Sequence, residues 1–399
     1  MNNKLGKNAK LLVINDIFYS LISIFISTFL VAYFLKITNE NITKVSIYYI
    51  IIYSLLGIGM LILSKVIKKH PKYANIIMCS GIVMRSLFLL FIVILADKII
   101  SYYVLIAVFY AIGESLFWSA HELIYIDVTT NDNRRNFMST KKILTKIISI
   151  IAPVILGTSI EVYSFSRIAI YVFILSVIQI AVALSINTNL SKAKGEKYRY
   201  KEFAEYVKKN NINKIKSYNL SGIPYGIVES SINTLIIIIT IMTFKTSFNL
   251  GILTTIFSLC SMASLMLYNK FYNKNNAKFI LWFCSAVMVF GVCGLLININ
   301  KTSLIIYNFC YTVTFYIFDV VYNTRKGDIV KECDIENYRE EYIAYTSIPI
   351  TVGRIIGYAL MLIVFFTTNV LYFKVLLAIV TIFAPFYCYL SVKSLKEYF

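Results

Sequence analysis

The sequence predicts an all-α polytopic membrane protein with about twelve transmembrane helices in two pseudo-symmetric six-helix bundles. Of its 399 residues, 58% are hydrophobic and only 15% are charged, a balance that soluble globular domains do not show. Long apolar segments alternate with short polar connections along the whole chain. Charged residues also recur at a fixed separation of 205 positions, which indicates an internal duplication.

Twelve apolar segments are long enough to span a membrane, because a helix needs roughly 20 residues to cross a hydrocarbon core of about 30 Å. In the first half of the chain they lie at 11–36, 43–67, 75–96, 99–126, 137–162 and 165–187. In the second half they lie at 217–243, 248–270, 277–298, 302–325, 340–367 and 370–391. We therefore predict an N-terminal bundle over 1–187, a cytoplasmic basic linker over 188–216 and a C-terminal bundle over 217–399.

The internal repeat relates charged residues of the two halves without any gap. The pairs that are 205 positions apart are Glu114 and Asp319, Lys65 and Lys270, Lys69 and Lys274, Asp127 and Glu332, and Arg134 and Arg339. A duplicated hydrophobic chain of this kind is typical of secondary transporters, in which two bundles enclose a binding site near the middle of the membrane. The repeat therefore favours transport as well as a two-bundle fold.

The positive charges predict the orientation in the membrane. With both termini in the cytoplasm, the cytoplasmic segments hold 29 of the 39 Lys and Arg residues and the outer loops hold 7. We expect a multi-pass protein of the cell membrane. The linker places Phe203, Tyr206 and Val207 among lysines, which favours a basic helix on the anionic inner leaflet or a solvated tether between the bundles.

Composition and motifs exclude several other classes of protein. The net charge of +19 does not indicate a nucleic-acid partner, because Lys and Arg fall between the apolar segments. The seven cysteines lack CxxC spacing, so we expect neither a metal site nor a cofactor. A membrane enzyme with His121 and Glu122 as its acid–base pair is the rival from another class, but the sequence has no phosphate loop, HExxH or nucleophile elbow. We do not expect an enzyme.

Carboxylates inside the predicted spans are candidate functional groups, since an ionised side chain at the bilayer centre costs roughly 2.5 to 3.5 kcal/mol. They are concentrated in the first span of each group of three, namely Asp16 in span 1, Glu114 and Glu122 in span 4, Glu229 in span 7 and Asp319 in span 10. We expect spans 1, 4, 7 and 10 to line an aqueous cavity.

Aromatic residues accompany these carboxylates at helical spacing. The stripes are Tyr110, Glu114, Trp118 and His121 or Glu122 in span 4, Tyr225, Glu229 and Asn233 in span 7, and Tyr311, Phe315, Asp319 and Tyr322 in span 10. Ring faces and a carboxylate suit a cationic or amphipathic ligand, and a partly desolvated carboxyl can exchange protons near neutral pH. The predicted residues for substrate binding or proton coupling are Glu114, Asp319, Glu229, Tyr110, Trp118, His121, Tyr225 and Phe315.

Structural roles remain open for the same residues. Each carboxylate could instead be the ion-pair partner of Arg85, Lys146 or Arg354, the basic residues within the spans. His121 could relay protons, or it could be a packed, hydrogen-bonded histidine.

The segment IDVTTNDNR, from Asp127 to Arg134, and its counterpart from Glu332 to Arg339 resemble the acid-to-arginine signature of the major facilitator superfamily. The resemblance implies two six-helix bundles and a cytoplasmic gate that charged pairs lock and release. Carried over, the gate residues are Asp127, Arg134, Glu332, Arg339 and Lys65. The loop after the second span departs from the family pattern, because Ser64 stands where the family has an acid.

Two further segments narrow the resemblance. APVILG, from Ala152 to Gly157, is similar to the Gly–Pro motif of proton-coupled exporters in this superfamily. The segment FWSAHELIYIDVTTNDNRRNF resembles poorly characterised bacterial transporters of the same superfamily. Together with the aromatic and acidic stripes, these similarities predict a monomeric secondary transporter that works by alternating access, couples to protons and exports a small amphipathic or cationic compound. Proton-coupled uptake and a non-transporting sensor or immunity protein are the alternatives.

Overall fold

The computed structural model describes residues 5–37, 42–129, 134–188, 197–210, 212–271, 276–365 and 370–395. Within these ranges, twelve helices are long and apolar enough to cross a membrane. They lie close to the twelve predicted segments: the first two, for example, run over Lys7–Ile37 and Ile42–Lys69. The prediction of an all-α polytopic fold is confirmed.

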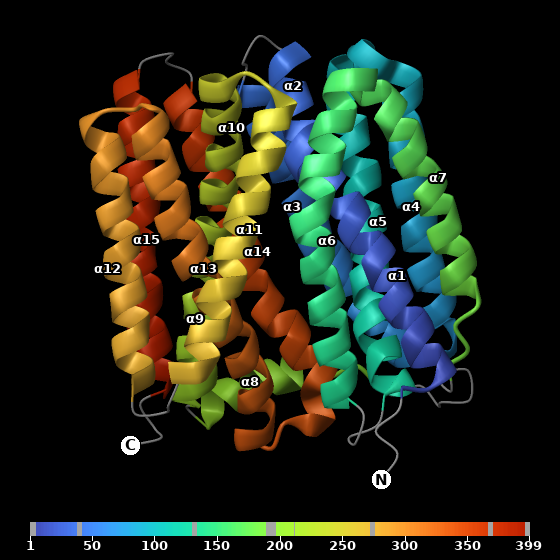
Figure 1. Ribbon diagram of the computed structural model, residues 1–399. Coiled ribbons are helices and arrows are strands. Elements are labelled where there is room, and N and C mark those ends of the chain that lie inside the picture. Colours follow the sequence, from blue (N-terminus) through green and yellow to red (C-terminus); the bar gives the residue numbers. More distant parts are fainter. Residues whose placement is uncertain are drawn as a thin grey trace. The chain divides into compact units, whose positions relative to one another are not determined.

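The first six spans are built from α1 (Lys7–Ile24), η1 (Phe25–Leu30), α2 (Val31–Ile37), α3 (Ile42–Lys69), α4 (Ala74–Leu95), α5 (Tyr103–Val128), α6 (Arg134–Tyr163) and α7 (Phe165–Leu184). The short 3-10 turns η2 (Pro71–Tyr73) and η3 (Ala96–Tyr102) precede α4 and α5. Figure 1 labels the longer elements in chain order.

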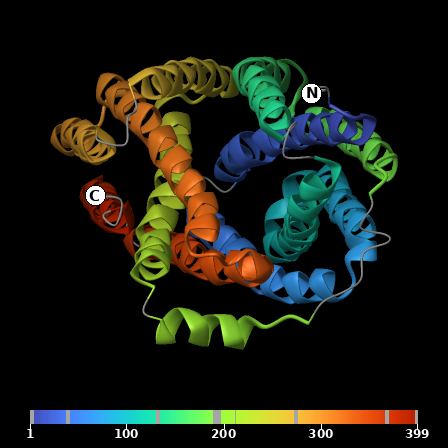
Figure 2. The same ribbon diagram turned by 90° about the horizontal axis from the view of Figure 1, so that it is seen from below.

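The remaining elements are α8 (Tyr200–Lys209), α9 (Asn213–Ile227), η5 (Val228–Ile232), α10 (Asn233–Phe244), α11 (Ser247–Phe271), α12 (Ala277–Ile297), α13 (Lys301–Glu332), η7 (Glu336–Tyr338), α14 (Arg339–Phe365) and α15 (Val370–Leu395). Helix α8 is the short amphipathic helix of the predicted linker. Figures 1 and 2 show that it runs across the ends of α9 and α14 and not along them.

The chain divides into two compact units. Unit 1 comprises Met1–Asn41, Ile51–Tyr198 and Thr246–Thr255, and unit 2 comprises Ile42–Ile50, Arg199–Lys245 and Ile256–Phe399. In unit 1, α4 packs against α5 and α7, and α1 packs against α6 and α7. In unit 2, α9 packs against α14 and α15, and α12 packs against α13 and α15.

Glycines allow the helices that carry charged side chains to approach one another closely. A Cβ atom on Gly81 of α4 would lie 2.5 Å from the backbone nitrogen of Phe117 on α5. In unit 2, a Cβ on Gly353 of α14 would collide with the carbonyl oxygen of Ile223 on α9. Since hydrophobicity does not drive helices together in lipid, close backbone packing is a main source of association. These two contacts hold the helices that carry the buried charges.

The first span of each half contains a π-helical segment. In the N-terminal half it covers Phe25–Leu30, and in the C-terminal half it covers Val228–Ile232. Shifted back by the repeat of 205 positions, 228–232 corresponds to 23–27, so the two segments overlap in the repeat. In general, π-helical turns occur often at functional sites. The second π-helical segment contains Glu229.

Replacing Gly353 by alanine is expected to loosen α14 from α9. The new methyl group would meet the Ile223 carbonyl, and overpacking of this kind costs about 1 to 3 kcal/mol. The thermal midpoint of the purified protein in detergent should therefore fall. Gly294→Ala on α12 is the matched control, because nothing lies within 4 Å of its Cβ position. Equal midpoints for the two variants would contradict the packing described here.

Candidate functional site

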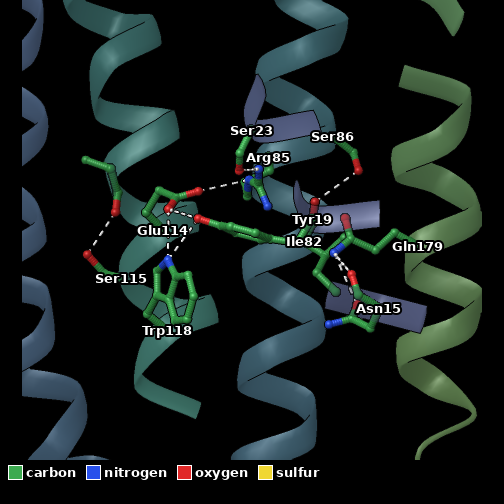
Figure 3. Close-up of polar contacts among 11 residues, drawn as sticks. Asn15, Tyr19, Ser23, Ile82, Arg85, Ser86, Glu114, Ser115, Trp118 and Gln179 are labelled. Carbon is green, nitrogen blue, oxygen red and sulfur yellow. Dashed lines mark hydrogen bonds and ion pairs between the residues drawn. The ribbon is translucent and has the colours of Figure 1, made fainter. Parts of the chain in front are cut away.

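Glu114 of α5 lies in a compact polar cluster of unit 1. Its Oε1 atom is 3.0 Å from Nε of Arg85 on α4, and the two side chains are only 7% and 1% exposed. Its Oε2 atom accepts hydrogen bonds from the Tyr19 hydroxyl at 2.6 Å and from Nε1 of Trp118 at 3.1 Å. Figure 3 shows these side chains converging from three helices.

Arg85 is held from several sides. Its guanidinium group lies 4.1 Å from the centre of the Tyr19 ring, and Nη2 donates to the Ser23 hydroxyl at 3.2 Å. The side chain of Glu114 is thus charge-balanced and oriented by its neighbours. The ion pair between Glu114 and Arg85, which the sequence left open, is present. Tyr110, the other predicted residue of this stripe, packs against Phe88 with ring centres 4.9 Å apart.

A second charged cluster lies about two turns further along α5 than Glu114. The Nε2 atom of His121 is 2.6 Å from Oδ1 of Asp16, and Nζ of Lys141 is 2.8 Å from Oδ2 of the same carboxylate. The ring of His121 also contacts Trp118 edge-on, with centres 5.4 Å apart. Polar groups therefore follow one another from Glu114 to Lys141. The Glu122 side chain, proposed above as the partner of His121 in an enzyme, lies outside the described residues.

In unit 2, Glu229 and Arg354 form a two-pronged ion pair. Nε and Nη2 of Arg354 donate to the two carboxylate oxygens of Glu229 at 2.7 and 2.8 Å. Unlike the pair in unit 1, the side chains of Arg354 and Glu229 are 21% and 29% exposed, respectively, although both lie within membrane spans. Glu229 comes from the π-helical segment η5, and Arg354 comes from α14.

Asp319 of α13 has a different environment. Its Oδ1 atom accepts hydrogen bonds from the Tyr225 hydroxyl and from Nδ2 of Asn323, each at 2.7 Å. Tyr225 on α9 is buried, and it lies one helical turn before Glu229. Tyr225 therefore connects the two carboxylates, because it donates to Asp319 and lies in the same membrane span as Glu229. The two carboxylates that the internal repeat relates, Glu114 and Asp319, have partners of different chemistry.

A stack of five aromatic rings from α9 and α13 lies beside Asp319 and includes its hydrogen-bond donor Tyr225. Consecutive ring centres are 4.7, 4.4, 5.9 and 5.1 Å apart in the order Tyr218, Tyr322, Tyr225, Phe315 and Tyr311. The stacked rings form an apolar wall beside a carboxylate, which suits a ligand with an apolar part and a positive charge. The sequence predicted Tyr225 and Phe315 from their spacing, but not the alternation of rings from two helices.

The structure describes the side chains of three of the five predicted gate residues. The carboxylate of Glu332 is 2.6 Å from Nη1 of Arg325 and 3.4 Å from Nζ of Lys214, so it joins α13 to α9. Asp127 borders a small pocket of about 170 Å³ with the first residues of α1. Lys65 is exposed.

The side chains of Arg134 and Arg339, the two arginines of the gate, lie outside the described residues. Sequence reasoning missed Arg325, which also donates to the Ser394 carbonyl at 2.6 Å and thereby ties α13 to α15.

The linker helix α8 is docked on unit 2. Phe203 and Val207 are buried, and the Phe203 ring contacts Tyr342 and Tyr345 of α14. The backbone N–H of Arg199 donates to Glu341 at 2.8 Å. The apolar face of α8, which the sequence assigned to the inner leaflet or to a tether, is covered by protein.

The described residues contain no group of three His, Cys, Asp or Glu side chains that could hold a metal ion. All seven cysteines are free.

Removal of Arg85 is expected to leave the Glu114 charge buried and uncompensated. Breaking a buried pair from one side costs about 3 to 5 kcal/mol, so Arg85→Met should lower the thermal midpoint strongly. The double variant Arg85→Met/Glu114→Gln should recover part of that loss, because no charge then remains. Losses that simply add in the double variant would contradict the charge pairing.

Comparisons with known proteins agree with this architecture. The sequence matches the family described as Major Facilitator Superfamily over residues 7–327. No curated protein matches the chain. Three solved structures that resemble it over nearly their whole length are a bacterial metal transporter, a bacterial homologue of the iron transporter ferroportin in an inward-facing state, and the nucleoside transporter NupG.

The likeness to these structures concerns the fold. The metal transporter and the ferroportin homologue are each 13% identical, cover 98% of this chain and 99% of their own, and have TM-scores of 0.65 and 0.69. The NupG structure is 10% identical, covers 98% of this chain and 100% of its own, and has a TM-score of 0.73. Because the family match extends over most of the chain and the fold agrees, the protein belongs to the major facilitator superfamily and is a multi-pass membrane transporter of that type.

Proposed function

We propose that the protein is a secondary active transporter that works by alternating access, couples transport to protons and exports a small amphipathic or cationic compound. The observation that carries this proposal is the position of Asp319 within a stack of aromatic rings, beside the Tyr225 hydroxyl and close to the Glu229–Arg354 pair. In this proposal the bundles are 1–187 and 217–399, and both termini face the cytoplasm of a cell in whose membrane the protein acts as a monomer.

The substrate class follows from the chemistry of this site. A cation gains from the carboxylates of Asp319 and Glu229, and the aromatic side chains Tyr225, Phe315 and Tyr322 supply apolar packing beside them. The partial exposure of Glu229 and Arg354 within the spans supports contact with water, because lipid would not solvate a charged pair. An amphipathic cation can place its apolar part on the rings and its charge at the carboxylates.

Coupling follows if a proton and the cationic substrate compete for Asp319. Tyr225 and Asn323 each donate a neutral hydrogen bond to its carboxylate, which stabilises the ionised form. Protonation removes the charge that binds the cation, so each ligand displaces the other. Glu114 is a second coupling residue in this proposal, since its protonation would release Arg85 and alter how α4 and α5 are held together.

The gate proposal keeps the residues of the acid-to-arginine signature. They are Asp127, Arg134, Glu332, Arg339 and Lys65. The ion pairs of Glu332 with Arg325 and Lys214 support a charge network at this end of unit 2. For the direction of transport, the support is the similarity of APVILG in α6 to the exporter motif. Pro153 lies inside that helix, and the Gly157 Cβ position is 2.6 Å from the Ser247 carbonyl oxygen.

The proposal is tested by a transport screen in proteoliposomes with and without an imposed pH gradient, using a panel of cationic and amphipathic compounds. We expect the gradient to drive at least one compound in the native protein. Asp319→Asn should abolish this flux, and Glu114→Gln should reduce it, while both variants remain in the membrane. Glu202→Gln, a neutralisation on the exposed face of α8, is the control and should transport normally. Native flux in Asp319→Asn would contradict the coupling role of Asp319. Transport in the direction opposite to export would indicate uptake.

A further inference from the structure

Several buried tyrosine hydroxyls of α9, α13 and α14 lack a hydrogen-bond partner among the described residues, namely those of Tyr218, Tyr307, Tyr311, Tyr322 and Tyr342, and three of them lie along one route to Asp319. Tyr218 on α9, Tyr322 on α13 and Tyr342 on α14 are at most 3% exposed, yet none of the three oxygens meets a donor or acceptor in suitable geometry. A buried hydroxyl without a partner is costly, and phenylalanine would supply the same ring without that cost. The hydroxyls therefore indicate a polar occupant inside the bundle.

These tyrosines lie between one end of unit 2 and Asp319. Tyr342 is in the first turn of α14 and Tyr218 is in the second turn of α9. Tyr322 follows Asp319 by three residues on α13, on the same face. Its ring stacks on Tyr218 on one side and on Tyr225 on the other, and Tyr225 donates directly to Asp319. The hydroxyls thus form a series that ends at the carboxylate.

The hydroxyls belong to close neighbours, because Tyr342 interacts electrostatically with both Tyr218 and Tyr322. The hydroxyls of Tyr218 and Tyr322 approach each other without forming a bond of good geometry. Gly222, between Tyr218 and Tyr225 on α9, lets the Tyr322 hydroxyl approach this helix closely, since a Cβ there would be 3.0 Å from its oxygen. Buried water is found where it can bond to otherwise unsatisfied polar groups, as these hydroxyls are.

We propose that water molecules join Tyr342, Tyr218 and Tyr322 to Tyr225 and form a proton relay that serves Asp319 from within unit 2. This inference rests on the proposed coupling role of Asp319. In the relay, each hydroxyl or water accepts a proton from the preceding oxygen and gives its own proton to the next. The last transfer runs from the Tyr225 oxygen to the Asp319 carboxylate, so one proton moves and every hydroxyl is restored. The transfer is concerted because an ionised tyrosine in this interior would be poorly solvated.

Charged groups lie at both ends of the relay. Arg325 and Glu332 are electrostatic neighbours of Tyr342 at one end. Glu229 and Arg354 are neighbours of Tyr322 at the other. Glu332 at the first end can accept protons. Arg325 and Arg354 oppose the entry of an additional positive charge. Exchange of protons along neutral hydroxyls is therefore favoured over the entry of a hydrated cation.

The relay is tested on the purified full chain by infrared spectroscopy after a rapid drop in pH. The carbonyl band of protonated Asp319 is identified by its loss in Asp319→Asn, and its rate of appearance is measured. Tyr218→Phe and Tyr322→Phe keep the stacked rings but remove one hydroxyl each, and each should slow the band by about tenfold with the final amplitude unchanged. Tyr307→Phe is the matched control, because this tyrosine is buried in the same helix twelve residues from Asp319, on the side away from Tyr322.

The outcomes separate the relay from the proposed function. A band that appears at the native rate in both Tyr218→Phe and Tyr322→Phe overturns the relay and leaves proton coupling at Asp319 standing. Equal slowing by Tyr307→Phe also overturns it, since the effect would then not follow the series. A native protein whose Asp319 shows no titrating band overturns the coupling role and the relay together.

Discussion

The free energy of placing a charge in a bilayer constrains most of this structure. Each ionised side chain within a span needs a counter-charge, a set of hydrogen-bond donors or contact with water. Arg85 and Glu114 satisfy this need by full burial and mutual contact, and Arg354 and Glu229 satisfy it with partial exposure. The close helix contacts at Gly81 and Gly353 serve this requirement, because they bring together the helices that carry the partners.

The two halves meet the constraint in different ways despite their common repeat. Glu114 contacts an arginine, a tyrosine and a tryptophan, whereas the carboxylate of Asp319 receives a tyrosine hydroxyl and an asparagine amide. The duplication thus provides a symmetric frame in which the two related carboxylates have partners of different chemistry.

The fold could be predicted from the sequence, because length and hydropathy alone determine which segments can cross a bilayer. The predicted segment 277–298, for example, corresponds to the span Ala277–Ile297. The predicted sites identified Glu114, Glu229 and Asp319 but could not assign their partners. The contacts of Asp16 with His121 and Lys141, and of Glu332 with Lys214, join helices whose adjacency no periodicity encodes. The buried tyrosine hydroxyls appear as ordinary aromatic positions in the sequence, since only packing shows that they lack partners.

The central claim is that Asp319 holds either a proton or a cationic substrate. The most direct measurement is the number of protons that the purified protein releases into weakly buffered solution when a transported compound binds. By linkage, the native protein should release up to about one proton per bound cation, and Asp319→Asn should bind more weakly and release none. Equal proton release by the native protein and by Asp319→Asn would contradict the account.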